Sequence, residues 1–125
     1  NAGSGSDVNI NTDLNVSGVV SDSAGSLRNL PQVSKSSAYT LIASDTGKHV
    51  SISSGNITVP SGVFSVGDIV TIFNNNSSTM SIVASGTTLR KAGTTGTGTC
   101  TLAVYGTASI LCVSSNVFVV SGNIS

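Results

Sequence analysis

The chain has 125 residues, a mass of 12.4 kDa, and five basic and five acidic side chains, so its formal net charge is zero. This size predicts one modest domain with a short appendage. Serine, threonine, asparagine and glycine supply 63 residues, and valine, isoleucine and threonine supply 39 β-branched residues. Because β-branched residues favour strands and strong helix formers are scarce, the composition excludes an α-helical protein.

Charge and hydropathy exclude further classes. The chain is 38% apolar with a mean hydropathy of +0.32, which is not the composition of a disordered protein. Its five cations are scattered and offset by five aspartates, so no basic stripe exists for nucleic acid. No apolar run approaches the ~20 residues of a membrane helix, and we expect no membrane insertion. The chain starts without a methionine or a secretory pattern, so we interpret it as a fragment or a processed product of a longer protein.

The first predicted element covers residues 8–16, where apolar and polar side chains alternate as in a half-buried strand. A lone strand is not stable in water, and no local partner follows it before the turn-forming residues 21–26. Two arrangements would give it a partner: it is an edge strand of the same domain, or several copies wrap their apolar faces inward as a shaft. The core of such a trimeric shaft would consist of Val8, Ile10, Leu14 and Val16.

After an extended connector that ends at Pro31, short predicted strands alternate with Gly-, Asn-, Ser- and Asp-containing turns. We predict residues 1–34 to be an extended shaft-like segment and connector, and residues 35–125 to be a globular β domain. The fold class is all-β: a small antiparallel β-sandwich or barrel, jelly-roll-like, with an N-terminal extended shaft strand, assembled as a trimer. The nine predicted strands of the domain are Tyr39–Ile42, His49–Ile52, Ile57–Val59, Asp68–Phe73, Met80–Ala84, Thr88–Arg90, Thr99–Tyr105, Ser109–Val113 and Val117–Val120.

The sequence contains no motif for catalysis or for metal binding. His49 is the only histidine and has no partner at a catalytic spacing, so we interpret it as a surface or interface residue. The alternative is that three copies of His49 meet on a trimer axis and hold an ion, for which Ser51 is a poor second ligand. We therefore expect no enzymatic activity, no cofactor and no metal.

The two cysteines, Cys100 and Cys112, have no second metal ligand near them. A hairpin that turns at Gly106 with a three-residue loop makes them diagonal neighbours on one face, at ~7–8 Å, beyond disulfide reach. A two-residue loop would instead put them on opposite faces. The register with the three-residue loop places more apolar residues on one side. It predicts two buried free thiols.

Several short motifs occur in a familiar order. They are Ala38–Leu41, Asp45–Lys48, Ile57–Pro60, Gly67–Asp68, the segment 102–111 and the closing Phe118–Gly122. In this order they resemble C-terminal β domains of tailed-bacteriophage fibre and other virion structural proteins. The preceding residues 11–18 resemble the shaft repeats of such proteins. The resemblance implies a homotrimeric virion appendage, located on the extracellular particle with other virion proteins as partners, and it carries over no catalytic residue.

Three function classes follow from these observations. The first is a non-enzymatic segment of a phage fibre or spike that attaches to the host surface. The second is a capsid-decorating, or cementing, protein, because trimers of small β domains also suit that role. The third is a carbohydrate-binding module or adhesin, for which a chain without tryptophan and with two tyrosines is poorly equipped.

Host contact by a distal domain would fall on its loops, because loops tolerate change while the scaffold holds them. Residues 74–79 and 92–98 are crowded with amides and hydroxyls, which can hydrogen-bond a host surface glycan without charge. The alternative is that both segments are ordinary solvated turns. The candidate receptor-contact residues are Asn74, Asn75, Asn76, Ser77, Thr94, Thr95 and Thr97.

Overall fold

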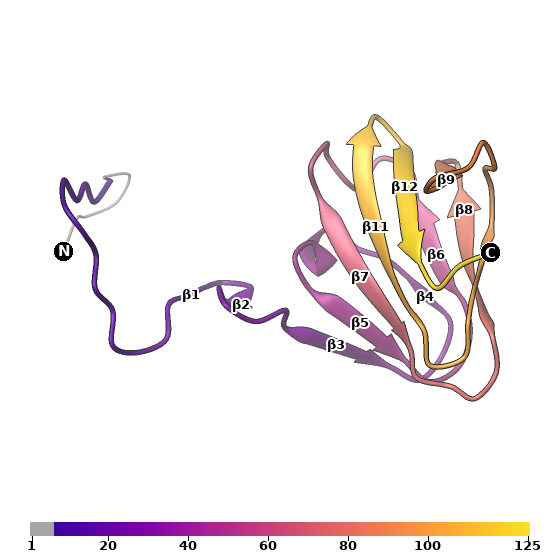
Figure 1. The fold of residues 1–125 in the computed structure, drawn as a ribbon, viewed down its shortest axis with the longest axis horizontal. Helices are drawn as coiled ribbons and strands as arrows, with labels where there is room; N and C mark the ends of the chain where they lie inside the picture. The colour runs from indigo at the N-terminus through magenta and orange to yellow at the C-terminus, as the bar shows by residue number, and fades with distance from the viewer. Residues whose placement is uncertain (1–6) are drawn as a thin grey trace.

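The computed structural model describes residues 7–125, so the first six residues of the predicted shaft-like segment lie outside the described part. Residues 32–125 form a β-sandwich of one six-stranded and one four-stranded sheet, and residues 7–31 extend away from it as an arm (Figure 1). No helix in the described part is both long and apolar enough to cross a membrane. The predicted all-β sandwich is confirmed.

Each sheet is mixed. The six-stranded sheet has the order β3-β5-β7-β11-β12-β9, and the four-stranded sheet has the order β10-β8-β6-β4. A two-stranded ladder, β1-β2, lies in the arm. The bounds are β1 Ser21–Asp22, β2 Gly25–Ser26, β3 Gln32–Lys35, β4 Tyr39–Thr40, the 3-10 helix η1 Ala43–Asp45, β5 His49–Ile52, β6 Ile57–Pro60, β7 Ile69–Asn74, β8 Met80–Ser85, β9 Thr88–Lys91, β10 Cys100–Leu102, β11 Thr107–Ser114 and β12 Val117–Gly122.

From β3 to β10 the chain changes sheet after every strand. Strands that are neighbours in a sheet therefore come from successive windings, and the pairs β3-β5, β5-β7, β4-β6 and β6-β8 are parallel. The antiparallel pairing predicted from the sequence holds only for β7-β11, β11-β12 and β8-β10. The turns from β3 to β11, including the one at Gly106, instead connect one sheet to the other. The prediction of an antiparallel sandwich is therefore wrong in this respect.

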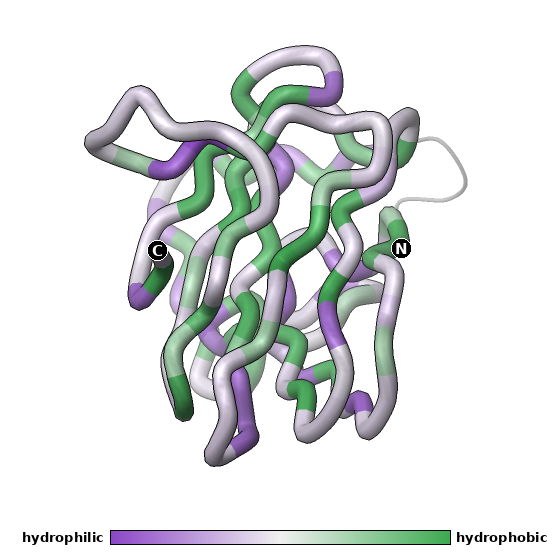
Figure 2. Tube along the Cα trace, turned by 90° about the vertical axis from the view of Figure 1, so that its right-hand side faces the viewer, coloured by the Kyte–Doolittle hydropathy of each residue, from purple (hydrophilic) through white to green (hydrophobic). Residues whose placement is uncertain are grey.

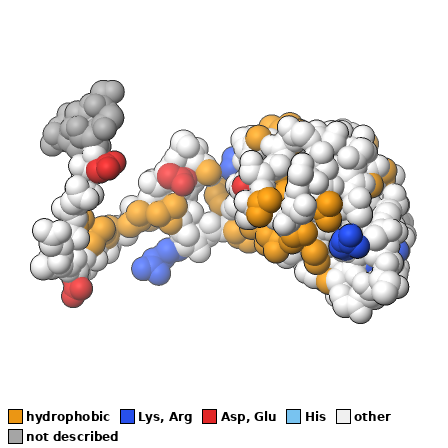
Figure 3. All heavy atoms as spheres, turned by 90° about the horizontal axis from the view of Figure 1, so that it is seen from above, with side chains coloured by type: hydrophobic (Ala, Val, Ile, Leu, Met, Phe, Trp, Pro, Cys, Tyr) orange, Lys and Arg blue, Asp and Glu red, His pale blue; other side chains and the backbone are white. Residues whose placement is uncertain are grey.

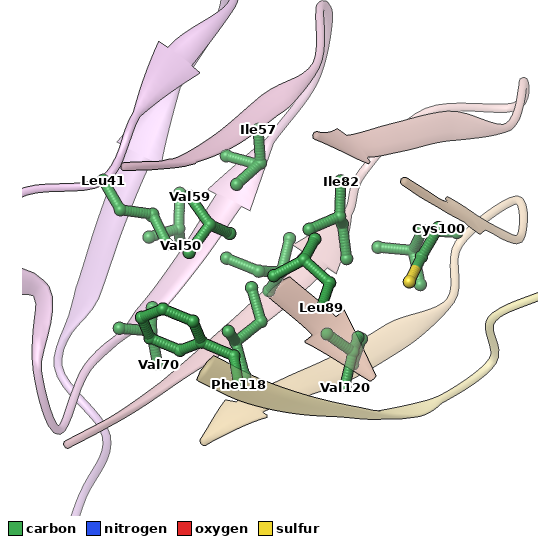
Figure 4. Packing of buried hydrophobic residues seen from close by; sticks show 14 of the residues in the cluster. Leu41, Val50, Ile57, Val59, Val70, Ile82, Leu89, Cys100, Phe118 and Val120 are labelled. Carbon is green, nitrogen blue, oxygen red and sulfur yellow. The ribbon is translucent and has the colours of Figure 1, made fainter. Parts of the chain in front are cut away.

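The core lies between the two sheets and is almost entirely aliphatic. Buried side chains of both sheets meet there, with Leu41 from a connecting loop (Figure 4). The apolar residues follow the strands, and the turns at both ends are mostly polar (Figure 2). Among residues 7–125, one aromatic pair packs edge-to-face, with the ring centroids of Phe64 and Phe118 6.0 Å apart. Burying an aliphatic side chain stabilises the fold by ~1.5–3 kcal/mol relative to leaving it exposed. The alternation of apolar and polar residues along a strand therefore decides which face of the strand packs on the core.

All nine strands predicted for the domain are present: His49–Ile52 has the predicted bounds, and the other eight have shifted ends. β3 was not predicted. It pairs in parallel with β5, so the sandwich begins at Gln32 rather than at residue 35. The predicted hairpin at Gly106 is wrong, because β10 pairs with β8 in the four-stranded sheet while β11 pairs with β7 and β12 in the other sheet.

Residues 8–16 form no strand within a single chain, and their side chains are exposed. Leu14 is 67% exposed and Val8 is 75% exposed. The alternative of an edge strand in the same domain is therefore wrong. The shaft made by several copies is not tested by one chain and stays a prediction.

Gly55 shows how closely the connecting loops stack. Its φ is +86°, and a Cβ at this position would lie 2.3 Å from the backbone nitrogen of Ala38 in the neighbouring crossing. Gly62 has a similar φ of +72° but open space around it. The turn at Gly55 therefore needs glycine both for its positive φ and for the close approach of the neighbouring backbone, whereas the turn at Gly62 needs glycine only for its positive φ.

We expect Gly55→Ala to lower the free energy of unfolding clearly more than Gly62→Ala, which should cost about 1 kcal/mol through backbone strain alone. The additional cost at Gly55 arises because backbone must shift. Urea unfolding of both variants measures the difference. Equal losses would show that the two crossings do not stack as described.

Candidate functional site

The winding gathers the loops at two ends of the sandwich. Connections from β3 to β4, β5 to β6, β7 to β8 and β10 to β11 lie at one end, which is the lower end in Figure 1. Connections from β4 to β5, β6 to β7, β8 to β9, β9 to β10 and β11 to β12 lie at the other. The predicted contact loop 74–79 belongs to the lower end and the loop 92–98 to the upper end. They cannot form one receptor site on a single domain.

Asn74 is part of the scaffold and not a contact residue. It is the last residue of β7, its side chain is 1% exposed, and its Nδ2 donates to the carbonyls of Ser78 at 2.8 Å and Ala103 at 3.0 Å. It thereby joins its own loop to the loop between β10 and β11. The prediction that Asn74 contacts a receptor is wrong, because β7 places this side chain on the core face.

Asn76 is also engaged within the lower end. Its Nδ2 donates to the carbonyl of Ser53 at 2.8 Å, and its Oδ1 accepts from the backbone N–H of Ser78 at 2.9 Å. The side chain is half-buried, whereas Asn75 and Ser77 are exposed. Only the latter two of the four predicted residues in this loop point to solvent.

The upper loop is braced by Thr94. Its Oγ1 donates to the carbonyl of Lys91 at 2.9 Å and accepts from the N–H of Gly96 at 3.0 Å. Thr95 and Thr97 are exposed, and Thr97 bridges back to Arg90. The loop is therefore a tight turn that leaves two threonine hydroxyls for an outside partner.

His49 fastens the arm to the sandwich. Its Nδ1 donates to the carbonyl of Leu30 at 3.0 Å, and its Nε2 lies 3.2 Å from Nε2 of Gln32, which can donate to it. The N–H of His49 also donates to the carbonyl of Pro31 at 3.0 Å. Both ring nitrogens thus lie within hydrogen-bond distance of a partner in the same chain. Across residues 7–125 no cluster of three potential metal ligands occurs.

Cys100 and Cys112 are buried and free, as predicted. They reach the core from different sheets, on β10 and β11, and not from one hairpin. Burial raises the pKa of the Cys100 thiol, although the charge of Lys91 opposes the shift. A neutral buried thiol packs as a small apolar side chain.

Asp45 closes the loop between β4 and β5. It is 2% exposed, and its Oδ2 accepts from Tyr39 Oη and from the N–H of Ile42, both at 2.8 Å. The Nζ of Lys35 lies 4.3 Å above the Tyr39 ring. Burial, the hydrogen bond to Asp45 and the charge of Asp45 raise the pKa of Tyr39 to about 12.

An apolar surface on the outer face of the six-stranded sheet was missed by the sequence analysis. Ile69, Leu111 and Val119 lie in register on β7, β11 and β12, and Val113 follows on the same face of β11. We call these four residues the apolar strip. Ile69 is 40%, Leu111 36% and Val113 41% exposed. The signal was in the unbroken apolar runs 69–70, 110–113 and 117–120, because a strand with one solvated face should alternate.

The arm carries a second exposed apolar surface. Every large apolar side chain of residues 8–30 is exposed, and Figure 3 shows them along the arm and a further apolar patch on the sandwich. Monomeric proteins seldom expose this much apolar surface unless it binds something. The residues are Val8, Ile10, Leu14, Val16, Val19, Val20, Leu27 and Leu30.

Comparisons with protein-family models, with curated proteins and with solved structures found no match to this chain.

We expect Asn74→Ala to lower the free energy of unfolding by ~1–3 kcal/mol, because two carbonyls lose their donor. Asn75→Ala, at the exposed neighbouring position, should change it by less than ~0.5 kcal/mol. Thermal unfolding followed by circular dichroism compares the two. Similar stabilities would contradict the scaffold role of Asn74.

The Tyr39 phenol should ionise with a midpoint near pH 12 in a Tyr105→Phe variant, where it is the only tyrosine. Because the pKa is raised above the ordinary value of ~10, its contribution to stability is complete below pH 10 and is lost as the pH rises toward 12. Ultraviolet absorbance of the phenolate measures the midpoint. A midpoint near 10 would show that Tyr39 does not contact Asp45.

Proposed function

We propose that this chain is a non-enzymatic segment of a homotrimeric virion appendage, a phage fibre or spike, in which the arms of three copies form a shaft and the sandwiches form a globular head. The other partners would be neighbouring virion proteins. Attachment to a host surface glycan is the accompanying role, and it would use the exposed residues of one loop end.

The observation that carries the proposal is the arm. Its apolar positions alternate over residues 8–16, yet these residues pair with no strand of their own chain in the described part. Nine residues of this pattern gain stability only when another extended chain covers the apolar side. Identical copies provide such chains in register, and the resemblance of residues 11–18 to shaft repeats favours three of them.

The sandwich suits the head of such an appendage. Its lower-end loops are joined to one another by the side chains of Asn74 and Asn76. A capsid-decorating trimer would use the same features, so position on the particle separates the two roles. Labelling the chain on intact particles supports the proposal if label lies on fibres or spikes, and overturns it if label covers the capsid.

We expect the wild-type chain to be a trimer by light scattering at micromolar concentration, and Leu14→Asp to dissociate it. A carboxylate on an apolar shaft axis costs several kcal/mol per trimer. Asn15→Asp, which introduces the same charge on the opposite side of the alternation, is the control and should stay trimeric. A wild-type monomer, or equal effects of both variants, would contradict a shaft packed through residues 8–16.

For attachment, we expect adsorption of particles to host cells to fall when one pair of exposed loop residues is replaced by alanine: Asn75 with Ser77 at the lower end, or Thr95 with Thr97 at the upper end. Only the end that points away from the particle should respond. Both pairs avoid the scaffold residues Asn74 and Thr94, so the trimer should persist. Unchanged adsorption for both pairs would leave a structural connector as the role of the domain.

A further inference from the structure

We propose that the apolar strip is the binding surface for a second copy of this chain, and that the arm hairpin of that copy, residues 19–27, packs on it. The inference deepens the proposed function and rests on its homotrimer. It adds a second contact between copies, on the sandwich, to the contact between shafts.

Apolar residues gather on the upper half of this outer face. Nearer the lower end, the outward positions of β7, β11 and β12 are mostly polar, namely Thr71, Thr107, Ser109 and Ser121, with Phe73 as the one large apolar exception. At the upper end the outward positions become isoleucine, leucine and valine within the same three strands. A sheet whose strands lose their alternation over one half of a face is built to be covered there.

The arm hairpin also lacks a partner. Its ladder has two residues on each side, extended by a hydrogen bond from the N–H of Leu27 to the carbonyl of Val20 at 2.8 Å. So small a hairpin does not persist alone in water. A pocket of about 230 Å³ separates it from the loop at Thr46 and Gly47 of its own sandwich, and Val19, Val20 and Leu27 remain exposed.

The hairpin does not cover the strip of its own chain, because Ile69, Leu111 and Val113 are all exposed there. Leu30 and Pro31 are fixed at the β3 edge by hydrogen bonds to His49. Leu27 is three residues from that anchor, a reach of roughly 10 Å. Ile69 on β7 is two strand spacings from β3, about 10 Å, whereas the centre of the strip on β11 is three spacings away, about 14 Å across the sheet. The hairpin of a neighbouring copy has no such tether.

Charge favours this pairing. The arm carries a net charge of −2 and the sandwich a net charge of +2, and Arg90 lies in register with Val119 at the end of the strip. An acidic arm is therefore attracted to the sandwich of a neighbour. The arm has Asp7, Asp13, Asp22 and Arg28; the sandwich has Lys35, Lys48, Arg90, Lys91, Asp45 and Asp68.

Interface size points to the whole chain as partner. A stable interface buries ~800 Å² on each side, more than four side chains supply. The buried area becomes large enough for a stable interface when one partner covers both the strip and the exposed arm. A second copy does both, because its own arm runs along the first.

Sedimentation of the full chain tests the inference with Leu111→Asp and Val113→Asp as strip variants, and Thr107→Asp as the control on the same strand and face. We expect each strip variant to raise the dissociation constant of the assembly about tenfold or more, since a carboxylate is buried against apolar side chains. Thr107→Asp should change it less than about twofold. Circular dichroism checks that each variant is folded. If Leu111→Asp is not folded, Val113→Asp is used in its place.

Leu27→Asp should weaken assembly like Leu111→Asp, and the double variant should be scarcely weaker than either, because both residues belong to one contact. A trimer unaffected by the strip variants but dissociated by Leu14→Asp would overturn this inference and leave the shaft standing. Strip variants that act additively with Leu27→Asp would overturn the hairpin as the occupant. A wild-type monomer would overturn both the inference and the proposed homotrimer.

Discussion

The structure depends on one constraint: the chain crosses between two sheets that lie ~10 Å apart after nearly every strand from β3 onward. Each crossing has few residues and must deliver a buried side chain at both ends, as Ile52 and Ile57 do on either side of Gly55. Neighbouring strands from β3 to β8 then run parallel, because each belongs to the next winding. The crossings stack on one another, which leaves no room for a side chain at Gly55.

This constraint also decides where recognition can occur. Stacked crossings exchange hydrogen bonds between loops distant in sequence, such as Asn76 with Ser53, and so consume amides that composition alone would assign to a ligand. What remains for an outside partner is a few hydroxyls and amides at two opposite ends, and one apolar strip on the side. Polar loops in this fold are first of all structural, and the surface least expected from a Ser- and Thr-rich chain is its apolar one.

The sequence predicted the strands well because period and turn residues are local signals. It could not assign strands to sheets, since a Gly-containing turn looks the same whether it reverses a strand or crosses to the opposite sheet; the wrong hairpin at Gly106 is the example. β3 was not predicted because its outward residues Gln32 and Ser34 are exposed at a sheet edge and only Val33 packs on the core. The burial of Asn74 could have been predicted, because Val70, Ile72 and Asn74 share one face of β7. The sequence could not show what covers residues 8–16, because no strand in the described part of the chain pairs with them.

Sheet edges explain why association should use faces and arms. A neutral, β-branched chain risks edge-to-edge pairing. Here residues 96–98 cover β9 through the bond from the N–H of Gly98 to the carbonyl of Leu89, and residues 123–125 cover β10 through paired bonds between Thr101 and Ser125. β4 has two residues, and β3 is short and carries Lys35. With its edges closed or blunted, the sandwich offers little free backbone for pairing, and its exposed apolar surface consists of side chains on the strip and along the arm.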